Sequence, residues 1–288
     1  MIGKTRLGAA AEVEETYDPE VGRAQGVLRR PLHAGKLRHS RRAPSADVAF
    51  WIAHYWSVSW DLRGLPAHIA QTLPHPNVHV VFENGTSAVS GVHTRKFSRV
   101  LEGQSSVFGI KFRPGGFRPF LESPVSRLRD RLVPARNFFG SGIDALEEIL
   151  LSSRPEDDKV HAADAFFRAR VPEPDRTIEL AAELVARILQ EPDIKTVDHL
   201  AAQSGIHKRS LERIFNEYVG VSPKWVIRRH RLHEAVERIH AGGRPDWAQL
   251  ALDLGYFDQA HLINDFRTIV GYSPARYRKQ VSPESRDR

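Results

Sequence analysis

The sequence predicts an α+β chain, with a small antiparallel sheet or barrel plus helices in its N-terminal half and an all-α C-terminal part. Residues 47–120 contain short runs of aromatic and β-branched residues separated by Pro and Gly clusters, which is typical of antiparallel strands. After residue 140, apolar residues recur at helical spacing. The C-terminal third contains the same helical unit twice, beginning at Leu200 and at Leu250.

Composition narrows the class of protein. A chain of 288 residues with 41% hydrophobic residues can form two packed domains. No stretch approaches the roughly 20 apolar residues of a membrane span, and residues 1–17 have no apolar signal core, so we expect a cytoplasmic protein without membrane contact. The absence of cysteine excludes disulfides and thiolate chemistry. A net charge of +7, spread over both halves, favours a polyanionic partner.

The N-terminal half is interpreted as a flexible tail over residues 1–25 followed by a sensor or dimerisation domain over residues 26–171. The basic segment 29–42 is broken by proline and glycine, so we expect loop or edge structure there. Strands are expected at 49–60, 78–82 and 106–112. Asn84-Gly85 directly after the second of these indicates a hairpin.

Two helices, around 143–150 and 160–169, should complete this domain because their apolar residues repeat at helical spacing. The segment Val171-Pro172-Glu173-Pro174 then breaks the helix, since each proline disfavours helix in the residue before it. We therefore begin the second domain at residue 172 and end it at 282. Its first element is an amphipathic helix over 178–189.

The first copy of the repeated unit is predicted to be a helix-turn-helix. Ala201 supplies a small side chain where two helices cross, and Gly205 can adopt the left-handed conformation of a sharp turn. The second helix has an apolar stripe at i, i+3, i+4 and i+7: Leu211, Ile214, Phe215 and Tyr218. Its outer face should read DNA through Lys208, Arg209, Ser210 and Arg213. Arginine suits this role because its guanidinium can fork onto guanine O6 and N7.

The second copy repeats this pattern, with Gly255 at the turn and Asp258 as N-cap of the second helix. Its apolar stripe is Leu262, Phe266 and Ile269. The outward residues predicted to contact DNA are Gln259, His261, Asn264 and Arg267. Glutamine and asparagine can pair with adenine N6 and N7.

A long helix is predicted to join the two units. Both copies close with glycine and restart a helix with Ser-Pro, and the first restart runs from Pro223 to His240. These residues span about 27 Å at roughly 1.5 Å each. With the width of the flanking units, this approaches one DNA turn of about 34 Å. One chain can thereby place two unlike reading helices in successive major grooves.

Residues 176–280 resemble the DNA-binding domain of the AraC/XylS family of bacterial transcription regulators, most closely over Gly255–Arg278. The resemblance implies that Arg209 and Arg213 contact bases from the first recognition helix. It assigns the same role to Gln259 and Asn264 in the second, where Asn264 replaces the family's common arginine.

The N-terminal half resembles an uncharacterised domain often found ahead of AraC-type domains. The resemblance rests on Tyr55-Trp56, Leu73-Pro74-His75-Pro76, Val107-Phe108-Gly109 and the segment 112–117. It implies a sensing or dimerising role without naming a ligand.

The leading hypothesis is therefore a sequence-specific transcription regulator controlled by its N-terminal domain. Its expected partner is double-stranded promoter DNA, and further candidates are RNA polymerase, a small-molecule effector and a second copy of the chain. The alternatives are an enzyme or repair protein carrying an attached DNA-binding module and a protein-interaction module. The cationic recognition faces argue against a protein-interaction module. The lack of cysteine excludes a repair protein that transfers alkyl groups to its own thiol.

No catalytic residue, cofactor or metal is assigned. His75 and His79 lack the helical setting in which a His-x3-His pair shares one face. The aromatic residues Trp51, Tyr55, Trp56 and Trp60 fit a packed core, and lining of a ligand pocket is the alternative.

Overall fold

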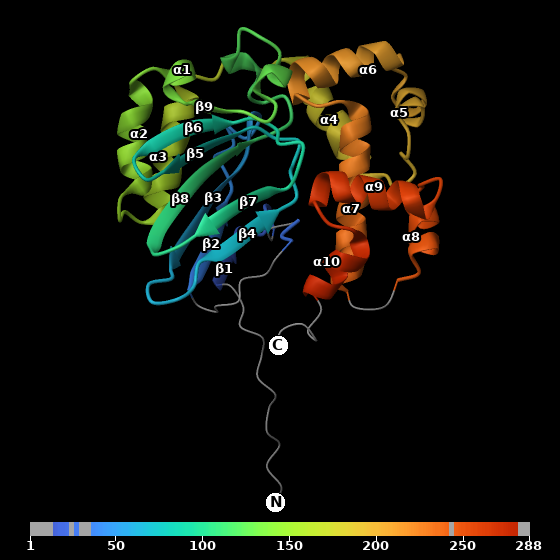
Figure 1. The fold of residues 1–288 in the computed structure, drawn as a ribbon. Coiled ribbons are helices and arrows are strands. Elements are labelled where there is room, and N and C mark those ends of the chain that lie inside the picture. Colours follow the sequence, from blue (N-terminus) through green and yellow to red (C-terminus); the bar gives the residue numbers. More distant parts are fainter. Residues whose placement is uncertain (1–13, 23–25, 29–35, 242–244, 282–288) are drawn as a thin grey trace, which may run out of the picture.

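The computed structural model describes residues 14–22, 26–28, 36–241 and 245–281. A β domain and a helical domain lie side by side (Figure 1). A seven-stranded sheet has the order β1-β2-β3-β8-β5-β6-β9, and a separate two-stranded sheet pairs β4 with β7. The bounds are β1 Glu14–Tyr17, β2 Leu37–Arg42, β3 Ile52–Asp61, β4 His68–Thr72, β5 His79–Glu83, β6 Thr86–Ser90, β7 Phe97–Leu101, β8 Gln104–Phe112 and β9 Leu132–Pro134.

All strand pairs are antiparallel except β1 with β2. The predicted hairpin is confirmed: Asn84 and Gly85 have φ values of 49° and 71°, and they join β5 to β6 in a two-residue turn. The α+β class with an antiparallel N-terminal sheet is likewise confirmed.

Two expectations for the N-terminal segment were wrong. Strand β1 lies within the segment expected to be a flexible tail, and β2 lies inside the sheet between β1 and β3 instead of in a loop. Both strands are polar, so hydrophobic alternation does not reveal them. Polar contacts contribute to their placement: the His39 ring lies 3.7 Å from the Glu15 carboxylate, and Arg42 forms an ion pair with Asp18 at 3.1 Å. Residues 1–13 of the expected tail fall outside the described residues.

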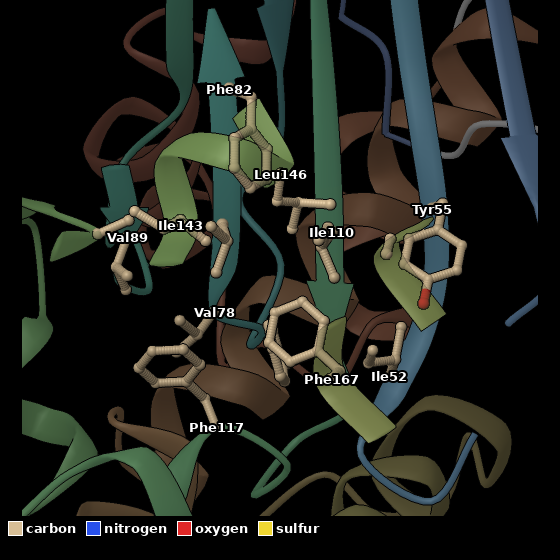
Figure 2. Close-up of a cluster of buried hydrophobic side chains, with 14 of the residues drawn as sticks. Ile52, Tyr55, Val78, Phe82, Val89, Ile110, Phe117, Ile143, Leu146 and Phe167 are labelled. Atoms are coloured by element: carbon tan, nitrogen blue, oxygen red, sulfur yellow. The ribbon is translucent and has the colours of Figure 1, made fainter. Parts of the chain in front are cut away.

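One face of the sheet packs against α2 (Gly142–Leu151) and α3 (Glu156–Arg168), and α1 (Arg136–Phe139) adjoins them. Figure 2 shows the resulting core, in which Phe82 of the sheet lies beside Leu146 of α2 and Ile110 lies beside Phe167 of α3. Trp51, Tyr55 and Trp60 are at most 5% exposed, which agrees with their interpretation as core residues. The Tyr55 hydroxyl donates a 2.6 Å hydrogen bond to the buried Asp164 carboxylate, which ties α3 to β3.

The opposite face of the seven-stranded sheet packs against the two-stranded β4–β7 sheet (Figure 1). Trp56, which is half-buried, lies flat against β8 at Gly109. A Cβ atom at position 109 would come within 2.0 Å of the Trp56 indole, so glycine is required for this close approach.

The helical domain contains α4 and the two predicted helix-turn-helix units, which are confirmed together with the long connecting helix. The bounds are α4 Arg176–Gln190, α5 Val197–Ser204, α6 Lys208–Ile214, α7 Pro223–His240, α8 Trp247–Asp253, α9 Gln259–Val270 and α10 Pro274–Val281. A π-helical turn, Phe215–Val219, extends α6. The expected domain boundary at 171–172 falls between α3 and α4 and stays a prediction. None of the described helices is long and apolar enough to cross a membrane.

The β domain contacts both helix-turn-helix units. The Arg229 guanidinium of α7 is 3% exposed and donates a 2.8 Å hydrogen bond from Nε to the Pro74 carbonyl. Arg118 pairs with Glu217 at 2.6 Å beside the first unit, and the backbone N–H of Lys96 donates to the Ile269 carbonyl at 2.8 Å in the second. The two domains are therefore joined by polar as well as apolar contacts.

Candidate nucleic-acid interface

The first recognition helix, α6, presents a polar outer face backed by buried apolar residues. Leu211 and Phe215 are 0% exposed and anchor the helix in the domain core. The turn before α6 uses Gly205 at φ 67°, as predicted. Of the residues predicted to contact DNA, Lys208, Arg209 and Arg213 are exposed and Ser210 is half-buried. The helix can therefore approach a ligand without rearranging its own core.

The cations on α6 differ in their availability. Within the described part of the chain, the guanidinium groups of Arg209 and Arg213 make no ion pair or hydrogen bond. The Lys208 ammonium lies 2.9 Å from the Asp198 carboxylate of α5. A DNA phosphate would compete with Asp198 for Lys208, whereas the two arginines need no such exchange. We therefore expect Arg209 and Arg213 to contribute more to binding than Lys208.

The second recognition helix, α9, exposes the side chains of all four residues predicted to contact DNA: Gln259, His261, Asn264 and Arg267. Leu262 and Phe266 on its back are 0% exposed. The His261 ring packs edge-on against Tyr256, with ring centroids 5.1 Å apart. This contact orients His261 at the N-terminal end of the helix, which is the end that enters a major groove in helix-turn-helix proteins.

Asp258 caps α9, as predicted: its Oδ1 accepts a 2.7 Å hydrogen bond from the His261 backbone N–H. We expect Asp258→Ala to lower the free energy of unfolding by about 1 kcal/mol, because a backbone donor loses its partner at the helix terminus. Urea denaturation of the full chain measures this. Asp258→Asn, which keeps an oxygen acceptor, should retain most of the stability; an equal loss in both variants would contradict the capping role.

Sequence reasoning did not single out Phe257, which is 89% exposed in the turn just before Asp258. An exposed phenylalanine beside polar reading residues can contact a thymine methyl group or a deoxyribose. The available signal was an aromatic residue placed directly before an N-cap, outside the apolar stripe.

The spacing of the two recognition helices is set by contacts inside and outside the helical domain. Inside it, the buried Asp265 of α9 forms a bidentate pair with Arg228 of α7. Outside it, Arg129 of the β domain donates a 2.9 Å hydrogen bond to the Gly220 carbonyl, where the first recognition helix ends. Lys96 holds the end of α9 through its backbone hydrogen bond to the Ile269 carbonyl.

Gly220 and Gly271, both in the left-handed conformation, form the helix ends that the β domain contacts. Arg129 reaches the first end and Lys96 reaches the second, where its ammonium also lies 3.9 Å from the Tyr272 ring centroid. Both recognition helices are thus held at their C-terminal ends, and of the residues predicted to contact DNA on α9 only Arg267 lies in the turn that is held. In the ranges described above, no group of three His, Cys, Asp or Glu side chains could hold a metal ion.

Two parts of the chain match known families. Residues 40–134 match a family described as a domain of unknown function (DUF6597), and residues 200–280 match a family described as a helix-turn-helix domain. A curated relative from Haemophilus influenzae, an uncharacterized HTH-type transcriptional regulator, is 29% identical over 103 residues. The match covers 36% of this chain and 34% of the relative, so the chain spans about a third of that relative's length.

Two of the solved structures that match the chain do so at low sequence identity and low TM-score. ToxT from Vibrio cholerae is 10% identical, with 74% of this chain and 97% of that chain covered and a TM-score of 0.38. CuxR, an AraC-like transcriptional activator, is 16% identical, with 69% and 86% covered and a TM-score of 0.20.

The match over 200–280 contains both repeats and the segment Gly255–Arg278, so the predicted resemblance of this part is confirmed. The match over 40–134 confirms the second resemblance, to an uncharacterised domain that precedes such helical domains. The chain thus carries a helix-turn-helix domain of the AraC type behind an N-terminal DUF6597 domain.

Proposed function

We propose that this protein is a transcription regulator that binds an asymmetric site on duplex DNA, with α6 and α9 in successive major grooves. The observation that carries the proposal is the pairing of two exposed polar helix faces on one chain, each backed by a buried apolar stripe. Arg209, Arg213 and Arg267 are exposed and form no ion pair among the described residues. Unpaired, exposed guanidinium groups suit phosphate and guanine contacts.

The two faces differ in chemistry, so the two half-sites should differ in sequence. The face of α6 is cationic, through Lys208, Arg209 and Arg213. The face of α9 combines the amides of Gln259 and Asn264 with Arg267. We expect guanine preference in the half-site read by α6 and adenine preference in the half-site read by α9.

The β domain is proposed to control the DNA-binding domain. Its support is the set of contacts that Pro74, Lys96 and Arg129 make with α7, α9 and the end of the first recognition helix. An effector that shifts these segments would change how the two recognition helices are presented. A small-molecule effector is the proposed partner of the β domain, and RNA polymerase and a second copy of the chain are further proposed partners.

Selection of bound sequences from random duplex DNA by the full chain tests this function. We expect a motif with two unlike halves centred about 10–10.5 base pairs apart. Affinity should also fall steeply with salt, because phosphate contacts release counterions. A motif of two identical inverted halves would contradict reading by one chain. Absence of any enrichment at low salt would contradict DNA binding itself.

A further inference from the structure

A group of basic side chains lies on the face of the seven-stranded sheet that packs against the two-stranded β4–β7 sheet. Lys111 of β8 is the cross-strand partner of both His54 on β3 and His79 on β5, so the three side chains leave the sheet on one face. Arg41 of β2 joins them, with Nη2 lying 2.9 Å from His54 Nε2. Four adjacent strands thus contribute a base to one place.

These groups are withdrawn from bulk water but retain some access to it. His54 and Arg41 are at most 9% exposed, while His79 and Lys111 are half-buried. Burial, together with the charges of Arg41 and Arg229, lowers the pKa of Lys111 to about 7. Burial also lowers the pKa of His79 to about 3, so this imidazole is neutral at physiological pH.

Two hydrogen-bond donors in this group have no acceptor in the described part of the chain. The Lys111 ammonium makes no hydrogen bond or ion pair there. The Trp56 indole N–H donates to His79 Nδ1 at 3.2 Å, so a neutral His79 carries its proton on Nε2. That Nε2–H has no acceptor among the described residues.

Two acids of this sheet face lie close to other bases. Glu83 pairs with Arg99 of β7, and the Glu15 carboxylate lies beside His39 and acts on the charge of Arg41. Lys111 forms no ion pair with either of them among the described residues. The helical domain contributes another cation, the buried Arg229 of α7, whose guanidinium donates to the Pro74 carbonyl. Among these cations the Lys111 amine favours its neutral form, and a bound anion would favour the protonated form.

We propose that Lys111 and His79 bind the anionic group, a carboxylate or a phosphate, of a small molecule whose uncharged part lies along Trp56 and Val81. Trp56, Val58 and Val81 continue the same face as half-buried apolar residues. The proposal rests on the regulatory role of the β domain, and it names the class of effector. Arg229 connects this site to α7, because its charge acts on Lys111 while its guanidinium holds the Pro74 carbonyl.

Thermal unfolding of the full chain without DNA tests the site. The probes are inorganic phosphate and benzoate, each compared with chloride at equal ionic strength. We expect at least one probe to raise the Tm of the wild type in a saturable manner, because ligands that bind only the folded state stabilise it. A response to phosphate alone indicates a phosphorylated effector, and a response to benzoate alone indicates a carboxylate with an apolar body.

The rise in Tm should be absent in Lys111→Met. In chloride this variant should have a higher Tm than the wild type, because an apolar side chain of similar length replaces a half-buried amine that has no anionic partner. Lys36→Met, which removes an exposed lysine, should keep the full rise. If Lys111→Met does not fold, NMR of the His79 imidazole in the wild type provides the test. The chemical shifts of its ring nitrogens should change on addition of the probe and saturate over the same concentration range as the rise in Tm.

The proposal is overturned if neither probe raises the wild-type Tm, if Lys111→Met responds like the wild type, or if the His79 shifts do not follow the probe. None of these measurements uses DNA. A failure here therefore leaves the DNA-selection result standing, and a failed selection leaves the anion site standing.

Discussion

Replacing Arg213 with alanine should weaken binding to the selected DNA site by roughly 5- to 150-fold, equivalent to about 1–3 kcal/mol, if the side chain reads a guanine. Arg213 is exposed on α6, makes no ion pair among the described residues and lies one turn beyond Arg209. Its guanidinium therefore loses no internal partner on reaching DNA. Titration of labelled duplexes by fluorescence anisotropy measures the effect on selected and scrambled sites.

The neighbouring Glu212 provides the control, because it is exposed on the same helix. Glu212→Gln should leave sequence preference unchanged. If Arg213→Ala weakens selected and scrambled duplexes equally and reduces the salt slope by about one, Arg213 contacts a phosphate. If neither duplex is affected, α6 does not enter the groove as proposed.

Gly91→Ala should destabilise the protein by at least about 3 kcal/mol, the upper part of the range for overpacked sites. A Cβ atom at position 91 would lie 1.8 Å from the backbone carbonyl oxygen of Leu128, so the backbone itself would have to move. The residue follows β6 and immediately precedes the segment that carries Lys96. Urea denaturation and expression in soluble form measure the loss.

Gly142→Ala is the matched control. The atom nearest to a Cβ there is the flexible end of Arg170, and Gly142 begins α2, where alanine is the better helix former. We expect stability to be unchanged or raised by up to about 1 kcal/mol. Similar stability of Gly91→Ala and the wild type would show that the crossing at Leu128 is loosely packed.

Gly91→Ala should also weaken DNA binding in whatever fraction of the protein still folds. Leu128 belongs to the same segment as Val125 and Arg129, which contact Gly220 at the end of the first recognition helix. The variant would therefore displace two of the segments by which the β domain contacts the helix-turn-helix units, those of Arg129 and Lys96. Comparison of its affinity with that of Gly142→Ala, corrected for the folded fraction, separates this effect from simple unfolding.

The helical domain was predictable because its boundaries depend on local chemistry. Left-handed turns at Gly205 and Gly220 and the Ser-Pro helix starts leave their marks within a few residues of sequence. The apolar stripes of both recognition helices are likewise local. Their outer residues follow directly, which is why seven of the eight predicted DNA-contacting residues proved to be exposed.

Contacts between distant segments could not be predicted in this way. Strand β1 is polar and pairs with β2 in parallel, so no hairpin turn marks the pairing in the sequence. The hydrogen bond from Arg129 to Gly220 joins residues 91 positions apart. Lys111 lies between the buried Ile110 and Phe112 on β8, so the sequence alone predicts that its side chain faces solvent. Only the register of three strands places it beside His54 and His79.

Arg129 and Lys96 hold the C-terminal ends of the two recognition helices without being among the residues proposed to contact DNA. In the proposed binding mode, the base preference of each half-site depends on the exposed residues of α6 and α9, whereas the distance between the half-sites depends also on Arg129 and Lys96. A substitution near Arg129 or Lys96 would then change the preferred spacing of the half-sites while every proposed base-reading residue stays the same. Base preference and half-site spacing could therefore evolve separately in this chain.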